Sequence, residues 1–142
     1  MQVLQKDIHR FMAGFWQIRQ NLAIKLNPVL KEKYSISLAE HFLLEHIATS
    51  NIKPTELAKT LQIPAHAISK KLESLQSAKL IKRTLDPNDA RKRVLTITKK
   101  GEKVLEKTTQ LIKNEVGDIL SRLEADRLEP FLIDLEIIGE NK

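Results

Sequence analysis

Basic side chains recur in one short, charged segment in the second half of this chain. Lys82 and Arg83 fall in a β-type run, and Arg91, Lys92 and Arg93 follow a turn-rich stretch a few residues later. Guanidinium and ammonium groups donate charge-assisted hydrogen bonds to phosphate oxygens, and arginine does so through two parallel N–H groups. The segment therefore offers the chemistry of polyanion binding, although a charged hairpin tip is also a common solvated surface loop.

The pattern around these residues predicts a β-hairpin. Two β-type runs, 81–85 and 94–98, flank a turn-rich tip at 86–93, with helix-patterned sequence on both sides. Ile52 and Lys53 could add a short third strand beside the hairpin. A lone basic hairpin after a pair of helices is the arrangement with which a winged helix-turn-helix reaches along a DNA backbone.

The positive charge is confined to the middle of the chain. Residues 53–103 hold 13 Lys and Arg against 5 Asp and Glu, whereas the rest holds 11 basic and 13 acidic residues. The excess of +8 in the middle and the −2 elsewhere give the net charge of +6. Such asymmetry indicates a module that faces a polyanion, on a near-neutral scaffold.

Composition narrows the class of protein. A chain of 142 residues with 42% apolar and 30% charged residues can bury a core and is not disordered. It has no cysteine, which removes disulfides, thiolate nucleophiles and Cys-type zinc sites. No apolar run approaches the length of a membrane span, and charges at Lys6, Asp7 and Arg10 argue against a signal peptide. We expect a cytoplasmic microbial protein.

Helical periodicity dominates the flanking sequence. A long first helix is predicted over about 6–32, with a kink or break at Pro28 near its end. Ser37 and Glu40 form a capping-box pair at the start of a second helix, over about 37–49.

After the hairpin, Thr98 is placed to cap another long helix, and a last helix over about 125–138 should begin or bend at Pro130. The first and last long helices are too apolar for surface elements. We expect them to pack together and to form a homodimer, whose two-fold axis suits pseudo-palindromic DNA.

Residues 54–78 are patterned as helix, tight turn and helix. Pro54 suits the first helical position, residues 62–64 form the turn, and Ile68, Leu72 and Leu75 make the core stripe of a second helix over about 65–78. A helix-turn-helix places such a second helix in the major groove. An ordinary amphipathic helix pair with a solvated face would share this pattern.

The outward positions of the second helix are small or polar. They are Ala65, His66, Ala67, Ser69, Lys70 and Lys71. Ser69 and Lys70 could reach base edges, and the small alanines would allow close approach and contact with a thymine methyl. Thr55 and Lys59 on the preceding helix, with the helix N-terminal amides, would take phosphates.

The sequence resembles the multiple antibiotic resistance regulator (MarR) family of winged helix-turn-helix transcription factors. The matching segments are ELAKTL (56–61), AISKKLESL (67–75), KLIKR (79–83) and DPNDARKRVLTITKKG (86–101). The length and the flanking helices match too. The resemblance implies a mainly α fold with a small β-hairpin wing and long N- and C-terminal dimerisation helices. It implies one domain over 1–142, with a DNA-binding lobe at 37–101 and a helical dimerisation region at 1–34 and 102–142.

The resemblance also implies roles for single residues. Ser69 and Lys70 would read bases, Arg91 would enter the minor groove from the wing tip, and Asp89 would hold that tip in shape. Three further basic residues of the hairpin would contact DNA as well: Arg83, Lys92 and Arg93. The chain departs from the family pattern where Gln62 and Lys79 replace turn glycines and where Pro64 replaces the usual Ser or Asp cap.

Two further sets of residues have a functional and a purely structural interpretation. His41, Glu45 and His46 are spaced for a metal site, but surface or interface histidines share that spacing, and we expect no metal or other cofactor. Four aromatic residues could line an effector cavity between the dimer helices and the DNA-binding lobe, or simply form core: Phe15, Trp16, Tyr34 and Phe42.

The function expected from the sequence is a cytoplasmic homodimeric regulator that binds a double-stranded DNA operator as a repressor, with a small-molecule effector as a further partner. A winged-helix protein–protein adaptor and a non-specific architectural DNA-binding protein are the alternatives. An enzyme is not expected, because the sequence has no Gly-rich phosphate loop and no Ser/His/Asp motif.

Overall fold

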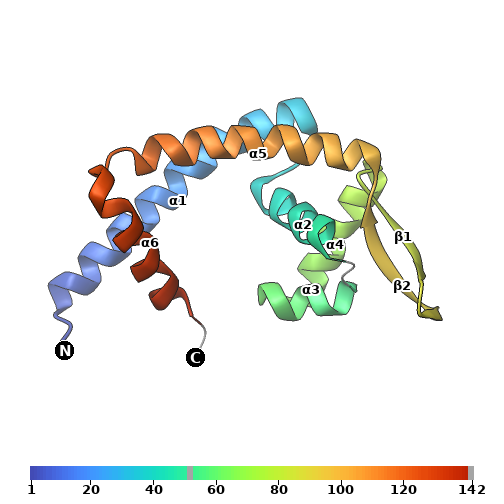
Figure 1. Cartoon of the computed structure of the whole chain (residues 1–142), viewed down its shortest axis with the longest axis horizontal. Coiled ribbons are helices and arrows are strands. Elements are labelled where there is room, and N and C mark those ends of the chain that lie inside the picture. Colours follow the sequence, from blue (N-terminus) through green and yellow to red (C-terminus); the bar gives the residue numbers. More distant parts are fainter. Residues whose placement is uncertain (51–52, 141–142) are drawn as a thin grey trace.

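The computed structural model describes residues 1–50 and 53–140 and confirms a mainly α fold with one β-hairpin (Figure 1). The elements are α1 (Gln5–Tyr34), α2 (Leu38–Thr49), α3 (Pro54–Leu61), α4 (Ala65–Ser77), β1 (Ile81–Asp86), β2 (Asp89–Ile97), α5 (Lys99–Leu120) and α6 (Ala125–Gly139). The predicted third strand involved Ile52, which lies outside the described residues; Lys53 is the N-cap of α3. None of the described helices is long and apolar enough to cross a membrane.

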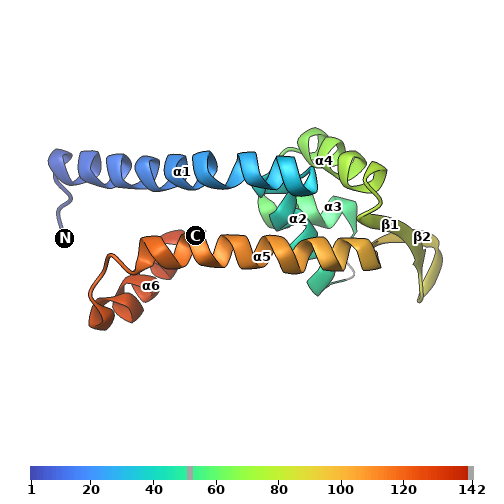
Figure 2. The same cartoon turned by 90° about the horizontal axis from the view of Figure 1, so that it is seen from above.

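The two long helices, α1 and α5, pack against each other as predicted and run side by side (Figure 2). At one end of this pair lie α2, α3, α4 and the hairpin, which we call the winged lobe. At the other end lie the N-terminus and α6 (Figure 1). The long helices therefore connect the basic segment to a helical region far from it.

Local sequence signals fix several helix ends. The Ser37 hydroxyl accepts the Glu40 N–H and a Glu40 carboxylate oxygen accepts the Ser37 N–H, both at 3.1 Å, so the predicted capping box is present. Pro54 occupies the first turn of α3. The Thr98 hydroxyl accepts the Gly101 N–H at 3.0 Å, which confirms it as the cap of α5.

Two prolines lie inside helices. The first helix continues through Pro28 to Tyr34, so it does not break there. Pro28 leaves the Ile24 carbonyl without its helical partner, but both residues are exposed and water can bind that oxygen. The last helix begins at Ala125, so the prediction that it could begin at Pro130 is wrong.

Among the described residues, three turns have a left-handed conformation without glycine, and two of them lie where the sequence departs from the family pattern. Gln62 ends α3 with φ 55° and ψ 39°, and Lys79 follows α4 with φ 63°. The turns that glycine usually makes in the family are therefore made here by residues that carry a Cβ, at a cost of about 1 kcal/mol each.

The hydrophobic core lies in the winged lobe and includes the C-terminal part of α1. It comprises Leu26, Leu30, Ile36, Leu43, Leu44, Ile47, Leu57, Ile68, Leu72, Leu75, Leu80, Ile81 and Leu95. The predicted stripe of the second helix is thus buried. By contrast, α6 buries no residue. Large apolar side chains on the N-terminal half of α1 and on α6 remain exposed: Ile8, Phe11, Met12, Phe15, Trp16, Ile18, Phe131, Ile133, Leu135, Ile137 and Ile138.

The hairpin is longer than the sequence predicts. Asp86 pairs with Asp89 across a turn at Pro87 and Asn88, and the Asp86 carboxylate accepts the Asn88 N–H at 2.9 Å. The strand β2 therefore begins at Asp89, and the prediction that Arg91, Lys92 and Arg93 lie in a tip loop is wrong.

The two strands do not pair evenly along their length. Leu85 pairs with Arg93, so residues 90–92 are extra residues of β2 opposite the step from Leu85 to Asp86. Such a bulge leaves part of the ladder unpaired.

Candidate nucleic-acid interface

The second helix of the helix-turn-helix presents the predicted residues to solvent. Because Ile68, Leu72 and Leu75 are buried, the opposite side of α4 is free of the lobe. Four of the predicted contact residues are exposed: Ala65, His66, Ser69 and Lys70. Ala67 and Lys71 are half-buried at the edge of this surface.

The N-terminus of α4 is suited to an anion. Pro64 takes the N-cap position without a side-chain hydrogen bond, and the first turn contains no acidic residue. The Pro64 carbonyl accepts the N–H groups of Ala67 and Ile68 at 3.0 and 3.2 Å. The earlier N–H groups, of Ala65 and His66, have no helical acceptor, and they carry the positive end of the helix dipole. The replacement of the usual cap by proline therefore leaves these amides open to a phosphate.

A groove joins α3 to the wing. It has a volume of about 510 Å³ and is lined by Lys53, Pro54, Thr55, Glu56, Lys59, Lys92 and Arg93. Four basic side chains against one carboxylate give this groove a positive potential. The structure thus brings together predicted phosphate contacts from two separate segments of the chain.

Lys53 is a residue of this groove that the sequence analysis did not select. The sequence pattern places Lys53 only in a short third strand beside the hairpin. Its place directly before Pro54, at the start of the basic middle of the chain, was the signal that pointed to the N-terminus of α3.

A second hollow lies behind the exposed surface of α4. Lys70, Lys71, Ala67 and Ser74 line it together with Glu40, in a volume of about 280 Å³. One oxygen of Glu40, Oε2, is buried without a hydrogen-bond partner. A carboxylate therefore shares this hollow with Lys70 and Lys71 of α4, a relationship between distant residues that the sequence did not indicate.

The wing exposes its basic residues. Arg83, Arg91, Lys92 and Arg93 are all solvent-exposed. The Asp89 carboxylate accepts the backbone N–H of Arg91 at 3.0 Å, a local turn of the kind that Asp forms with the residue two positions on. Arg91 is thereby held within the bulge, near the end of the hairpin.

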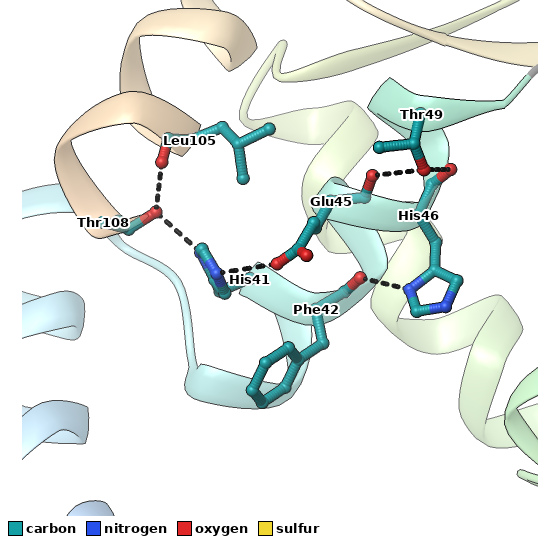
Figure 3. Close-up of polar contacts among 7 residues, drawn as sticks. All are labelled: His41, Phe42, Glu45, His46, Thr49, Leu105 and Thr108. Atoms are coloured by element: carbon teal, nitrogen blue, oxygen red, sulfur yellow. Dashed lines mark hydrogen bonds and ion pairs between the residues drawn. The ribbon is translucent and has the colours of Figure 1, made fainter. Parts of the chain in front are cut away.

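The histidines form separate contacts (Figure 3). His41 is 2% exposed; its Nδ1 lies 2.7 Å from the Thr108 hydroxyl and its Nε2 lies 3.4 Å from Glu45. Burial lowers the pKa of His41 below its ordinary value of 6.5, against the opposing effect of Glu45. His46 instead lies 2.9 Å from the Phe42 carbonyl. Within residues 1–50 and 53–140, no three His, Asp or Glu side chains are placed to hold a metal.

The four aromatic residues predicted to line an effector cavity are not gathered within one chain. Phe15 and Trp16 are about half exposed on the N-terminal half of α1, whereas Tyr34 packs against the core at its other end. At 1.5 Å per residue, about 27 Å of helix separates Tyr34 from Trp16. Phe42 is 46% exposed on α2.

An exposed second helix, an open helix N-terminus and a basic hairpin beside them define this protein as a winged helix-turn-helix protein. The MarR family model matches residues 34–92, which cover most of the winged lobe. The chain is similar to the HTH-type transcriptional regulator TcaR of Staphylococcus aureus, with 27% identity over 94% of this chain and 90% of the relative.

Solved structures show the same fold over the whole chain. The transcriptional regulator BldR from Sulfolobus solfataricus matches with a TM-score of 0.80 and 24% identity, over 97% of both chains. A mutant MarR from E. coli complexed with operator DNA matches with a TM-score of 0.79 and 24% identity, over 98% of this chain and all of that one (100%). The resemblance to the MarR family seen in the sequence is therefore confirmed.

Proposed function

We propose that this chain is a homodimeric transcriptional regulator of the cytoplasm that binds a pseudo-palindromic DNA operator and represses the genes next to it. The observation that carries the proposal is the basic groove between α3 and the wing, beside the open N-terminus of α4. One phosphate backbone could follow this surface while α4 enters the adjacent major groove. The TcaR relative, a transcriptional regulator by name, and the MarR structure with operator DNA support this proposal.

Different residues of this surface would contact the bases, the phosphates and the minor groove. Ser69 and Lys70 read base edges, and Ala65 and Ala67 allow the helix to approach a thymine methyl. His66 and Lys71 flank this contact. Phosphates are taken by the groove and by the base of the wing, through Thr55, Lys59, Arg83, Lys92 and Arg93. Arg91 enters the minor groove, where a narrow A·T-rich segment has the most negative potential, and Asp89 shapes the bulge that carries it.

The helical ends of the chain would form the dimer. Apolar side chains on the N-terminal half of α1 and on α6 are about half exposed, in segments that contribute no buried residue to the core of their own chain. Apolar patches of this extent mark protein interfaces. The chain accordingly divides into the winged lobe, 37–101, and a dimerisation region, 1–34 and 102–142. Two lobes related by a two-fold axis would meet successive major grooves of one DNA face.

A small-molecule effector would release the operator by favouring a different separation of the two lobes. Phe15 and Trp16 on α1 and Phe42 on α2 expose aromatic side chains that such a ligand could contact. Since about 27 Å of α1 separates Trp16 from Tyr34, a shared pocket would require residues of both copies. The effector site is therefore expected to exist in the dimer and not in one chain.

The test is selection of bound fragments from random duplex DNA at physiological salt, with mixed non-specific DNA as competitor. The proposal expects a two-fold symmetric site with about 10 base pairs between half-site centres. Lys70→Ala should relax base preference within each half-site, whereas Arg122→Ala, at the opposite end of α5 from the wing, should leave it unchanged. Equal binding to all duplexes would indicate an architectural protein, and no binding an adaptor; either result overturns the proposal.

A further inference from the structure

We infer that Thr98, Lys100 and Gly101 clamp the end of α4 to the start of α5 and so set how far apart the two half-sites of an operator can lie. These three residues touch no DNA in the proposed complex; they are positioning residues. The inference rests on the proposed homodimer and operator, but the clamp itself can be measured in the protein without DNA.

The contacts converge on three consecutive carbonyls. The Lys100 ammonium donates to the Ala78 carbonyl at 2.9 Å, and the Thr98 hydroxyl donates to the Lys79 carbonyl at 2.7 Å. The Thr98 backbone N–H donates to the Leu80 carbonyl at 3.0 Å. The carbonyls at the C-terminal end of a helix have no partner within it. Here groups at the N-terminus of α5 take the three carbonyls that follow α4.

One hydroxyl serves both helices. While the Thr98 Oγ1 donates to Lys79, it accepts the Gly101 N–H at 3.0 Å and so caps α5. The left-handed conformation of Lys79, with φ 63°, turns the chain at this point. The same oxygen atom therefore caps α5 and binds the turn after α4, so the two helices cannot shift independently.

Gly101 permits the close approach. A Cβ built on this buried residue would overlap the Leu80 carbonyl oxygen and lie 2.7 Å from Ile97 Cγ1. The first obstacle is backbone, which cannot rotate aside as a side chain can. Any larger residue at position 101 must push α5 away from the turn after α4.

A small rotation at this clamp has a large effect at the DNA. The 13 residues of α4 span about 20 Å from the clamp to Ala65. A rotation of about 10° would therefore move the N-terminus of α4 by about 3 Å, close to the 3.4 Å rise of one base pair. Because Ile68, Leu72 and Leu75 are buried in the core, the whole lobe would move with α4.

The first test measures the clamp in the free homodimer. Since the chain has no cysteine, His66→Cys near the N-terminus of α4 and Lys113→Cys on α5 can carry spin labels without competing sites. Labelled chain is mixed with excess unlabelled chain, so that each measured distance lies within one copy. Thr98→Val and Lys100→Met should broaden the distance distribution, and Thr98→Ser should restore it. An unchanged distribution in folded Thr98→Val and Lys100→Met proteins overturns the inference, whatever the protein does with DNA.

The second test uses the selected operator with one base pair added or removed between its half-sites. The native chain should lose about tenfold in affinity per base pair, which corresponds to about 1.4 kcal/mol. Lys100→Met, which removes one exposed contact from a folded lobe, should reduce this loss to about threefold or less. Lys113→Met makes an equivalent change on the exposed face of α5 and should leave the tenfold loss per base pair unchanged.

The outcomes of the second test separate the two ideas. A native chain that tolerates every spacing overturns the proposed operator and, with it, the role of the clamp in spacing. A native chain that discriminates, with variants that discriminate equally, overturns the clamp alone. Thr98→Val should lose discrimination between spacings, and Thr98→Ser, which keeps the hydroxyl, should retain it. A general loss of stability would not produce this difference between the two variants.

Discussion

The imidazole of His41 and the hydroxyl of Thr108 lie 2.7 Å apart and join the winged lobe to α5. The Thr108 hydroxyl donates to the Leu105 carbonyl at 3.2 Å, so its oxygen can accept from the imidazole Nδ1, while Nε2 lies 3.4 Å from the Glu45 carboxylate. The ring is 2% exposed, and a charge on it would be poorly hydrated. Burial therefore disfavours the charged form of the ring that makes this link.

This burial predicts that acid weakens the fold. The pKa of His41 is lowered in the folded chain, from an ordinary value of 6.5 that the unfolded chain keeps. Its contribution to stability is thus present above pH 6.5 and is lost as the pH falls towards the lowered pKa. Thermal melts between about pH 7.5 and pH 5 should show a steeper loss for the native chain than for His41→Gln, which cannot titrate. His66→Gln, on the exposed surface of α4, is the control; if all three slopes agree, His41 does not govern the acid response.

Arg91→Ala tests the wing. Loss of one cation from the minor groove should weaken operator binding about tenfold and lower the slope of log affinity against log salt by about 1. Fluorescence anisotropy titrations from low to physiological salt would measure both. Arg122→Ala removes the same charge at the far end of α5 and should change neither. Unaltered affinity in Arg91→Ala would show that Arg91 does not enter the minor groove.

Gln62→Gly should stabilise the protein. Gln62 has φ 55°, where a Cβ is strained and glycine is not, so the substitution should raise the free energy of unfolding by up to about 1 kcal/mol. The matched change Gln76→Gly, in the right-handed backbone of α4, should lower it by roughly 0.5–1 kcal/mol. Urea unfolding at fixed chain concentration measures both. A loss of stability in both variants would contradict the left-handed turn.

The exposed apolar face of α6 should control self-association. Phe131→Lys combined with Ile138→Lys places two cations where the proposed interface is apolar, and sedimentation should show a shift from dimer towards monomer. Leu85→Lys changes an equally exposed apolar residue on the wing, which is 55% exposed, and should leave the dimer intact. A dimer that survives the double substitution would place the interface elsewhere.

The predictions that the structure confirms depend on residues close in sequence. The Ser37 and Glu40 capping box, Pro54 at the start of α3 and the Thr98 cap are each encoded within one helical turn. The buried stripe of Ile68, Leu72 and Leu75 follows from helical period alone. These local rules were sufficient to place the helix-turn-helix and the hairpin, and hence the class of fold.

The features that the sequence did not reveal depend on distant residues. Turn-forming residues at 86–89 suggested a long loop, because nothing local shows that Asp86 and Asp89 pair across only two residues. The latch between Thr98 and Lys79 spans 19 positions, and the His41 contact to Thr108 spans 67. Composition could not show that Phe15 lies on the exposed N-terminal half of α1, far from Tyr34 at the other end. Helical periodicity predicts the side of a helix on which a residue lies, but not the element that packs against that side.

The bulge at residues 90–92 allows the length of the wing to change without a change in the fold of the lobe. In a paired strand, one added or lost residue turns every following side chain to the other face, and Val94 and Leu95 would leave the core. Within the bulge, a change of length has no partner strand to displace, so the base of the hairpin keeps its register. Insertions and deletions there can lengthen or shorten the wing over one unchanged core. Proteins with this fold can thus differ in the length of the wing while the fold of the lobe stays the same.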